Sequence, residues 1–450
     1  MKLGPRLAVV LLAIAAVAGG AAADPLSLNV DQMRIYGGEA VARGYADQAL
    51  EIADALLSRD TQDSAAWAIR AQALREKGDL AGSAAAARSA WATSDSPANR
   101  YTAATSLAQA LSLQGHRMVA QYWLRQAAQN APNAGTRAQA EQDYRYVRSQ
   151  NPLRLQFDAA IKPSDNVNNG TPEFILGYIG TAGGAVPLYL PPEFTPLSGY
   201  AWSLGLTGSY KLAERQSSED ALTFALNTQG IVLSAAAQKT APAADPNNYA
   251  FSQIETGWQH KAALSFGFLT SDIKVGHNWY GMTDLSDRLS AGLTLDHDFS
   301  NTVQGSLEGL VTRQIRIDRP QSTSTQGGLT ASLDLTGPGG DQWQVAAAVS
   351  RSASADPGVQ SVARSLTVVW SAGKPLMGLG LGAYASFGAT SYDSGRYDER
   401  TAFGVSANVT KIGYLGFSPV VSLDYSSNAS TFRQFATKAT GLGISLKSNF

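Results

Sequence analysis

Residues 199–210 read GYAWSLGLTGSY, and almost every second side chain in this stretch is large and apolar. Successive side chains of a strand point to opposite faces, so Trp202, Leu204 and Leu206 share one face. The other face carries only alanine, serine, glycine and threonine. Aromatic rings stand at both ends of the apolar face, at Tyr200 and Tyr210. The stretch predicts a β-strand with one apolar face and one small, polar face.

The same pattern recurs along the last two thirds of the chain. Residues 288–299, RLSAGLTLDHDF, repeat it, and we count fourteen such runs from Leu153 onward. A soluble sandwich also alternates, but three features favour an outer-membrane barrel: a small polar face suited to a lumen, aromatics at strand ends, and links that alternate between short and long. We therefore predict a 14-stranded antiparallel transmembrane β-barrel over residues 151–450, with both of its ends in the periplasm.

Residues 442–450 have the pattern expected of the strand that closes a barrel. Leu442, Ile444, Leu446 and Phe450 fall on one face, and we expect them to face lipid. A strand in hydrocarbon cannot leave its backbone groups unpaired, so the last strand is expected to pair with the first. The terminal phenylalanine resembles the C-terminal signal that the outer-membrane barrel insertion machinery recognises, which makes that machinery an expected partner.

The segment from Val30 to Gln150 has a different period. It is rich in alanine, and Gly44, Gly78 and Gly115 recur every 34 to 37 residues between apolar-periodic segments. This spacing resembles the helix-turn-helix tetratricopeptide repeat. Such repeats stack into grooves that bind extended peptides or other proteins. A spacer or stabilising plug beside the barrel is the alternative interpretation.

The N-terminus indicates export. Lys2 and Arg6 precede an apolar run that ends in small residues, which predicts a signal peptide over residues 1–23 with cleavage between Ala23 and Asp24. The predicted domains are then the signal peptide (1–23), a periplasmic helical repeat domain (24–150) and the outer-membrane barrel (151–450). The chain has no cysteine, and its formal net charge of -1 gives no electrostatic case for nucleic acid as a partner.

Two further stretches carry a family resemblance. One is "KPSDNVNNG" just after the first strand, with Asp165, Asn166 and Asn168, and the other is the tail that begins "GYLGFSPVVSLDYSSNAS". The tail positions that match the family pattern are Gly416, Pro419, Asn428, Ser430 and the closing Phe450. With the preceding helical repeats, these motifs resemble the surface lipoprotein assembly modulator family.

The resemblance implies an outer-membrane translocator that delivers a surface lipoprotein or small secreted protein across the outer membrane. The helical repeats would bind the client in the periplasm and the barrel would provide the passage. An outer-membrane polysaccharide export channel is the alternative function. A sugar-conducting lumen is expected to be rich in aromatic and acidic groups, whereas the polar face here is small and hydroxylated.

Other candidate sites have plainer explanations. The four histidines show no metal-ligand spacing, and Asp296 and Asp298 are expected to line the lumen, so we predict no enzyme activity, metal or cofactor. The segment around Asn166 could bind calcium through oxygens, but a turn needs the same residue types.

The surroundings of the barrel suggest two further sites. The apolar first loop, 162–199, could form a plug, a client-docking patch or a packed loop. Outer-membrane lipid is an expected partner, and so is lipopolysaccharide. Arginines near the outer strand ends could bind lipopolysaccharide. The alternative interpretation is that these arginines are ordinary solvated loop charges. They are Arg313, Arg316, Arg319, Arg351, Arg364, Arg396, Arg400 and Arg433.

Overall fold

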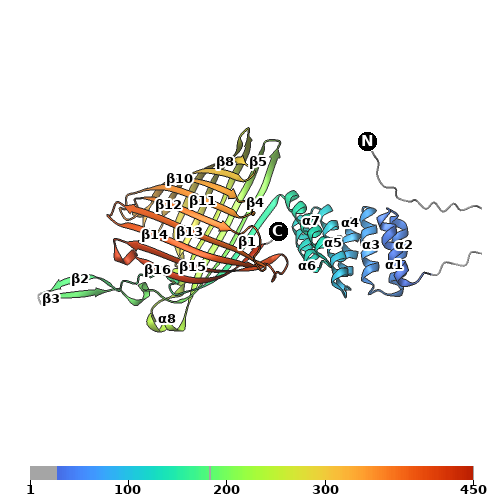
Figure 1. Ribbon diagram of the computed structural model, residues 1–450, viewed down its shortest axis with the longest axis horizontal. Helices are drawn as coiled ribbons and strands as arrows, with labels where there is room; N and C mark the ends of the chain where they lie inside the picture. Colours follow the sequence, from blue (N-terminus) through green and yellow to red (C-terminus); the bar gives the residue numbers. More distant parts are fainter. Residues whose placement is uncertain (1–27, 182–183, 449–450) are drawn as a thin grey trace, which may run out of the picture. The chain divides into compact units, whose positions relative to one another are not determined.

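The computed structural model describes residues 28–181 and 184–448, where seven helices precede a closed barrel of fourteen antiparallel strands (Figure 1). This architecture confirms the predicted fold class. The chain is divided between Ser94 and Asp95 into two compact units. The expected cleavage site at Ala23 and Asp24 and the terminal Phe450 lie outside the described residues.

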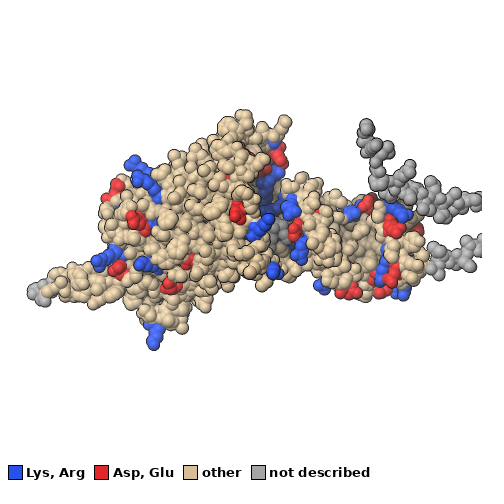
Figure 2. Space-filling view, viewed as in Figure 1, with Lys and Arg blue, Asp and Glu red and all other residues tan. Residues whose placement is uncertain are grey.

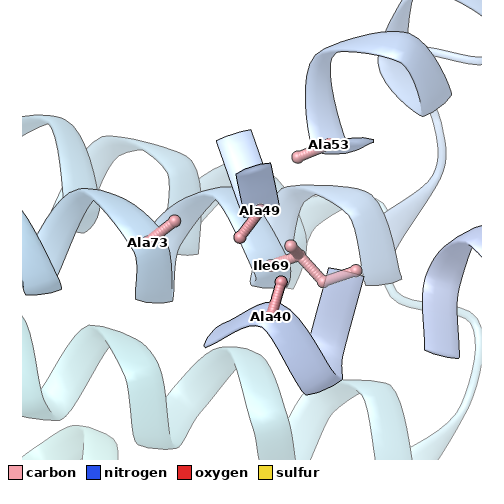
Figure 3. Packing of buried hydrophobic residues seen from close by; sticks show 5 residues of the cluster. All are labelled: Ala40, Ala49, Ala53, Ile69 and Ala73. Carbon is pink, nitrogen blue, oxygen red and sulfur yellow. The ribbon is translucent and has the colours of Figure 1, made fainter. Parts of the chain in front are cut away.

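The first unit contains four helices, α1 (Val30–Ala42), α2 (Ala46–Arg59), α3 (Ser64–Glu76) and α4 (Leu80–Ala92). Its core is built from small side chains: Ala40, Ala49, Ala53 and Ala73 surround Ile69 (Figure 3). Alanine has the highest helix propensity and lets helix backbones approach closely, so the same residues favour both the helices and their packing.

The second unit begins with α5 (Pro97–Leu113), α6 (Arg117–Asn130) and α7 (Ala134–Gln150), and the change to strands follows between Gln150 and Leu153. Three of the helix-to-helix turns in the described chain contain a predicted glycine. Gly44, Gly78 and Gly115 have φ of +79°, +81° and +82°, in the left-handed region that costs glycine little.

The barrel contains fourteen antiparallel strands. From β4 to β16 each strand pairs with the next one in the chain, and β1 closes the ring by pairing with both β16 and β4. The strands are β1 (Leu153–Ser164), β4 (Gly199–Arg215), β5 (Ser218–Leu233), β6 (Phe251–Leu264), β7 (Gly267–Tyr280), β8 (Thr283–Ser300), β9 (Val303–Arg316), β10 (Ser324–Thr336), β11 (Gln342–Ser354), β12 (Ser361–Ser371), β13 (Leu379–Tyr392), β14 (Tyr397–Val409), β15 (Phe417–Ser430) and β16 (Thr437–Ser448).

The links between strands alternate between short and long, as predicted, only in part of the barrel. The base, where β1 begins after α7, has two-residue links in the first half of the barrel, but links 372–378 and 410–416 are longer. At the opposite end, which we call the outer mouth, β7 and β8 are joined by two residues alone. The longest mouth segments are 165–198, which contains the separate two-stranded sheet β2 (Ile175–Thr181) and β3 (Gly184–Tyr189), and 234–250, which contains α8 (Ala235–Thr240).

Candidate functional site

The polar face of the strands is the inner face of the barrel. A cavity of about 380 Å³ near the mouth is lined by Ala160, Ala201, Gln229, Ser426 and Ala439, among others, which come from β1, β4, β5, β15 and β16. Only the concave side of a closed barrel brings five strands to one cavity. Because strand side chains alternate, the register extends this assignment around the ring and leaves the apolar residues facing outward.

One side of the lumen carries ion pairs. Lys162 Nζ on β1 lies 3.0 Å from Asp424 Oδ2 on β15, across the intervening Gly441 of β16. A Cβ at Gly441 would lie 2.4 Å from Lys162 Cε, so the glycine makes room for the lysine side chain. The hydroxyl of Tyr384 donates to Asp424 Oδ1 at 3.1 Å. No local pattern in the sequence indicates this cluster, because its strands lie far apart in the chain.

A second ion pair has the same design. Arg288 Nε on β8 lies 4.0 Å from Glu255 Oε2 on β6, and Gly276 of β7 stands between them in the register. Next to this pair, Lys274 Nζ lies 3.5 Å from Asp272 Oδ2 on the same strand. No local pattern in the sequence indicates either pair, because the partners lie on strands that are not consecutive in the chain.

The strands β10 to β13 give the other side of the lumen a different surface. Thr367 and Ser386 share a hydrogen bond of 2.9 Å between their hydroxyls, and Gln326 Nε2 donates to Ser350 Oγ at 3.2 Å. Among the described inward positions of these four strands, Asp334 is the one charged residue. We call this sector the hydroxyl wall, defined by the small inward residues Gly328, Thr330, Ser332, Ala346, Ala348, Ser350, Ala363, Ser365, Thr367, Ser386 and Gly388.

The predicted Asp165, Asn166 and Asn168 bind the backbone at the mouth. Asp165 exchanges two hydrogen bonds with Thr440: its amide donates to the Thr440 carbonyl, and its carboxylate accepts from the Thr440 amide. The Asn166 side chain accepts from the Gly170 amide and donates to the carbonyls of Gly170 and Lys438.

The Asn168 side chain fastens the returning segment in the same way. Its amide group donates to the carbonyls of Glu193 and Thr195, and its oxygen accepts from the Leu197 amide. Because the side-chain oxygens of Asn166 and Asn168 already accept backbone N–H groups, the arrangement favours the structural turn over a calcium site. In the described ranges no group of three or more His, Asp or Glu side chains is placed to hold a metal ion.

The motif positions near the C-terminus lie at both ends of the barrel. Asn428 Nδ2 donates to the Phe435 carbonyl, and Ser430 Oγ donates to Asp398 Oδ1 at 2.6 Å, so both hold the mouth link after β15. Gly416, with φ of +74°, lies in the base link before β15, and Pro419 lies opposite Leu446 in the β15–β16 ladder. The predicted lipid-facing Leu442, Ile444 and Leu446 are about half exposed, at 48%, 51% and 52%.

The two ends of the apolar first loop are packed at the mouth. Val167 and Leu197 are buried against a cluster of Leu233, Ala237 and Ala241, and residues 166–169 line the cavity inside the barrel. The strands β2 and β3 of this loop pair into a ribbon whose large side chains, among them Tyr178, Ile179 and Val186, are more than half exposed. Phe174 and Tyr189 stack at its root, with ring centroids 6.4 Å apart. The buried ends of the loop fit the packed-loop interpretation, and the exposed ribbon is compatible with the docking patch.

The remaining singled-out residues have local partners. His277 lies 2.7 Å from Asp287 and 3.2 Å from Asp284, and His260 lies 2.8 Å from Asp220. Asp296 and Asp298 lie on the inward side of β8 at the base, and His116 precedes α6. Of the mouth arginines, Arg316 pairs with Asp318 and Arg396 with Asp398. By register Arg313, Arg351 and Arg364 point outward.

At the base, Arg125 of α6 joins the helices to the barrel within the second unit. Its guanidinium donates to the Leu415 carbonyl at 2.8 Å, to the Tyr144 hydroxyl at 3.0 Å and to Ser448 Oγ at 3.0 Å. It also lies over the rings of Tyr144 and Phe417, 4.7 Å and 4.5 Å from their centroids. No local pattern singles out Arg125, because its barrel partners are remote in the chain.

The described helices include none that combines the length and apolarity needed to cross a membrane. No family model matches the chain, and no curated protein is significantly similar to it.

Solved structures with a similar architecture are distant in sequence. A bacterial polysaccharide outer membrane secretin is 7% identical, with 65% of this chain and 98% of that chain covered and a TM-score of 0.34. Pseudomonas putida OprB is 8% identical, with coverage of 70% and 96% and a TM-score of 0.37. An anion-selective porin from Comamonas acidovorans is 10% identical, with coverage of 66% and 100% and a TM-score of 0.30. Likeness at this level does not carry an activity from one chain to another.

Proposed function

We propose that this protein is an outer-membrane translocator that delivers a partner protein to the cell surface. The helical repeats bind the client in the periplasm, the barrel provides the passage, and the client is a surface lipoprotein or a small secreted protein. In this proposal the base of the barrel faces the periplasm and the mouth faces outward, in contact with lipopolysaccharide.

The outer surface of the barrel supports a membrane location. Large apolar side chains on the outward face are about half exposed on strand after strand, among them Leu204, Ile273, Leu329 and Leu366. On the face shown in Figure 2, charged side chains gather towards the two ends of the barrel and leave a band between them that is almost free of charge. Exposed apolar surface of this extent marks a membrane or a partner interface, and a belt around a closed barrel fits the bilayer.

The attachment of α6 to the base is the observation that carries the proposal. Two hydrogen bonds from Arg125 hold α6 against the link 410–416 and the end of β16, and a third joins it to Tyr144 of α7. In our proposal α5–α7 belong to the surface that binds the client, and this attachment keeps them beside the base of the barrel. A protein held by the helices would need no separate carrier to reach the barrel.

The side of the lumen formed by β10 to β13 favours a polypeptide over a sugar polymer, whereas the opposite side carries acidic groups, among them Asp424, Glu255 and Asp272. Tyr384 and Tyr392 are the aromatic residues at the described inward positions of β10 to β13, and Asp334 is the acidic one. Sugars are bound by stacked aromatic rings and acidic groups, which this wall does not supply in series. Small hydroxyl groups offer many weak hydrogen bonds to any backbone, and a passage needs sites weak enough to release what they bind.

Protease shaving of intact cells tests the proposal. We would compare a strain lacking the protein with strains that express the full chain or a chain without residues 28–94, which belong to the first compact unit. The full chain is expected to restore one or a few surface proteins that the null strain retains inside. The shortened chain is expected to restore the barrel but not the delivery.

Two results would contradict parts of the proposal. A surface proteome that is the same with and without the protein would overturn the translocator and favour the polysaccharide channel. Full delivery by the shortened chain, with its barrel shown to be assembled by heat-dependent mobility in detergent gels, would overturn the client-holding role of α1–α4.

A further inference from the structure

Three arginines lie together on the outward face of the barrel near the mouth. Arg313 of β9, Arg351 of β11 and Arg364 of β12 are exposed, and each lies three residues from the mouth end of its strand. The next outward residues towards the base are apolar and about half exposed: Val311 (53%), Val349 (45%) and Leu366 (45%). The arginines therefore lie where the apolar face of these strands ends.

Two of these arginines flank β10, where the outer surface is hollow. Arg313 Nη1 donates to Thr325 Oγ1 at 2.8 Å, which holds this side chain over the neighbouring strand. Arg351 on the other side lies opposite Gly327, the next outward residue of β10. A Cβ at Gly327 would meet nothing within 4 Å, so the outward face is open at this position.

The third arginine adjoins the other two on the next strand. Arg351 lies opposite Val362 in the β11–β12 register, which makes Arg364 its diagonal neighbour on the same face. Diagonal neighbours are about 7–8 Å apart, a span that long side chains can bridge. A cavity of about 470 Å³ beside Arg364 includes Leu366 and Phe387 in its lining. Charged groups and an apolar hollow thus adjoin each other on the membrane side of the barrel.

The arginine side chains have no acidic counterparts. Among the described residues no ion pair joins any of the three to a carboxylate. In the nearby mouth links, Asp318 and Asp356 have partners of their own. Glu399 of β14 lies in the row of Arg364, but Ala389 of β13 stands between them. Unpaired guanidinium groups at the border of hydrocarbon are costly, so this arrangement favours an anion from outside the chain.

We propose that Arg313, Arg351 and Arg364 bind the phosphate groups of a phosphorylated lipid, whose acyl chains lie along the apolar strand faces towards the base. A guanidinium binds phosphate through two parallel N–H groups, and the hollow at Gly327 gives the phosphate room between two of them. A lipid also covers the exposed Val311, Val349 and Leu366, which a free phosphate ion cannot do.

This inference rests on the proposed function only for the identity of the lipid. With the mouth directed outward, the site lies in the outer leaflet, and the lipid is lipopolysaccharide, whose anchor carries phosphates. The contact is thereby confined to the sector from β9 to β12. Other mouth arginines do not belong to the site, since Arg316 and Arg396 are paired with aspartates.

Titration of the purified full chain in a neutral detergent with the phosphorylated lipid anchor of lipopolysaccharide tests the site. Binding is measured by native mass spectrometry. Arg351→Gln is expected to weaken binding about fivefold, and Arg351→Gln with Arg364→Gln about thirtyfold. The matched control is Arg433→Gln, which removes an exposed arginine from the mouth link between β15 and β16 and is expected to leave binding unchanged.

Three results would overturn the site. The first is an affinity of the double variant within about twofold of the Arg433→Gln control. The second is equal binding of the same lipid anchor after its phosphates have been removed. The third is release of the lipid by millimolar inorganic phosphate, which would show that a free anion occupies the arginines without a lipid.

Filling the hollow at Gly327 gives a second test that changes no charge. The open space lets Gly327→Trp place an indole between Arg313 and Arg351, and lipid binding is expected to weaken at least about fivefold. Ala429→Trp adds the same ring to the outward face of β15 near the mouth and is expected to leave binding unchanged. Equal affinities of the two variants, both with heat-dependent mobility in detergent gels, would contradict a site at this hollow.

The lipid site and the proposed function can fail separately. The titrations use purified protein and need no client, so they decide the site even if no surface protein depends on this chain. Delivery that continues in cells with the double arginine variant would show that translocation does not require the bound lipid, and the titration would still stand.

Discussion

Replacing Arg125 with alanine removes the guanidinium that fastens α6 to the base of the barrel. The substitution deletes hydrogen bonds to Leu415, Tyr144 and Ser448 and the contacts with the rings of Tyr144 and Phe417. A neighbouring bond remains, from the Leu415 amide to Gln129 Oε1 at 3.0 Å. The variant therefore weakens the attachment of the helix without touching the strand ladders.

The size of the effect follows from these contacts. Each hydrogen bond contributes about 1 kcal/mol net at a half-buried position. Each cation–π contact contributes about 0.5 kcal/mol where it is partly solvated. The contacts with Tyr144 join α6 to α7, whereas the bonds to Leu415 and Ser448 and the contact with Phe417 join α6 to the barrel. These last three amount to about 2.5 kcal/mol, which is a factor of about 70 in the equilibrium between attached and released helices.

Hydrogen exchange measured by mass spectrometry reports this equilibrium in the link 410–416. In Arg125→Ala the protected amides of this link, Leu415 among them, are expected to exchange about 70 times faster wherever exchange follows local opening. Arg125→Lys keeps the charge but lacks the planar fork that serves three acceptors, so an intermediate rate is expected. Gln129→Ala removes one bond and is expected to accelerate exchange by about fivefold.

Two outcomes would refute the reasoning. Exchange in Arg125→Ala within about threefold of the unchanged protein would show that the guanidinium does not hold the helix. Equal acceleration in β10 to β13 would show that the substitution unfolds the barrel instead of releasing α6.

Three further predictions concern the mouth and the lumen. Asn166→Ala removes three hydrogen bonds of a buried side chain to Gly170 and Lys438, so the unfolding free energy of the barrel in detergent should fall by about 2–3 kcal/mol, measured by heating. Asn247→Ala, on an exposed turn, is the control and should change the stability little. Lys162→Met should shift ion selectivity in planar bilayers towards cations, and Asp424→Asn should shift it towards anions, measured as reversal potentials in a salt gradient. Reversal potentials equal to that of the unchanged protein would place this pair outside the conducting path. The Ser322 hydroxyl and then the Gly358 amide hold the pKa of Asp356 below its usual range, so these two hydrogen bonds are expected to be present at neutral pH and lost as pH falls below about 4. Amide exchange at Gly358, corrected for its intrinsic pH dependence, should then rise, and Asp356→Asn should abolish the change.

The strands and turns were predictable because their signals are local. Alternation in residues 199–210 identifies a strand and its two faces without any partner. Glycines at a spacing of 34 to 37 residues identify the helical turns, because a left-handed φ favours glycine wherever it occurs. The count of fourteen strands rests on these local periods and needs no knowledge of register.

The ion pairs in the lumen and the incomplete pairing of β1 with β16 could not be predicted in the same way. Lys162 and Asp424 are brought together by a strand order that closes the ring, and the sequence between them contains most of the barrel. Nothing in the alternation of β1 and β16 shows that, among the described residues, only three pairs are aligned between them, since each strand keeps a full partner on its other side. The mouth motif was found by resemblance, but its role became visible only from the backbone groups that Asn166 and Asn168 bind.

Crosslinking inside the lumen of living cells tests the passage most directly. Thr367 of β12 points into the hydroxyl wall, and the adjacent Leu366 points outward with 45% of its surface exposed. A photocrosslinking amino acid at Thr367 is expected to capture the surface protein whose delivery depends on this chain, and the same group at Leu366 is not. Delivery that continues at the normal rate with no crosslink at Thr367, or with equal crosslinks at both positions, would contradict passage through the barrel.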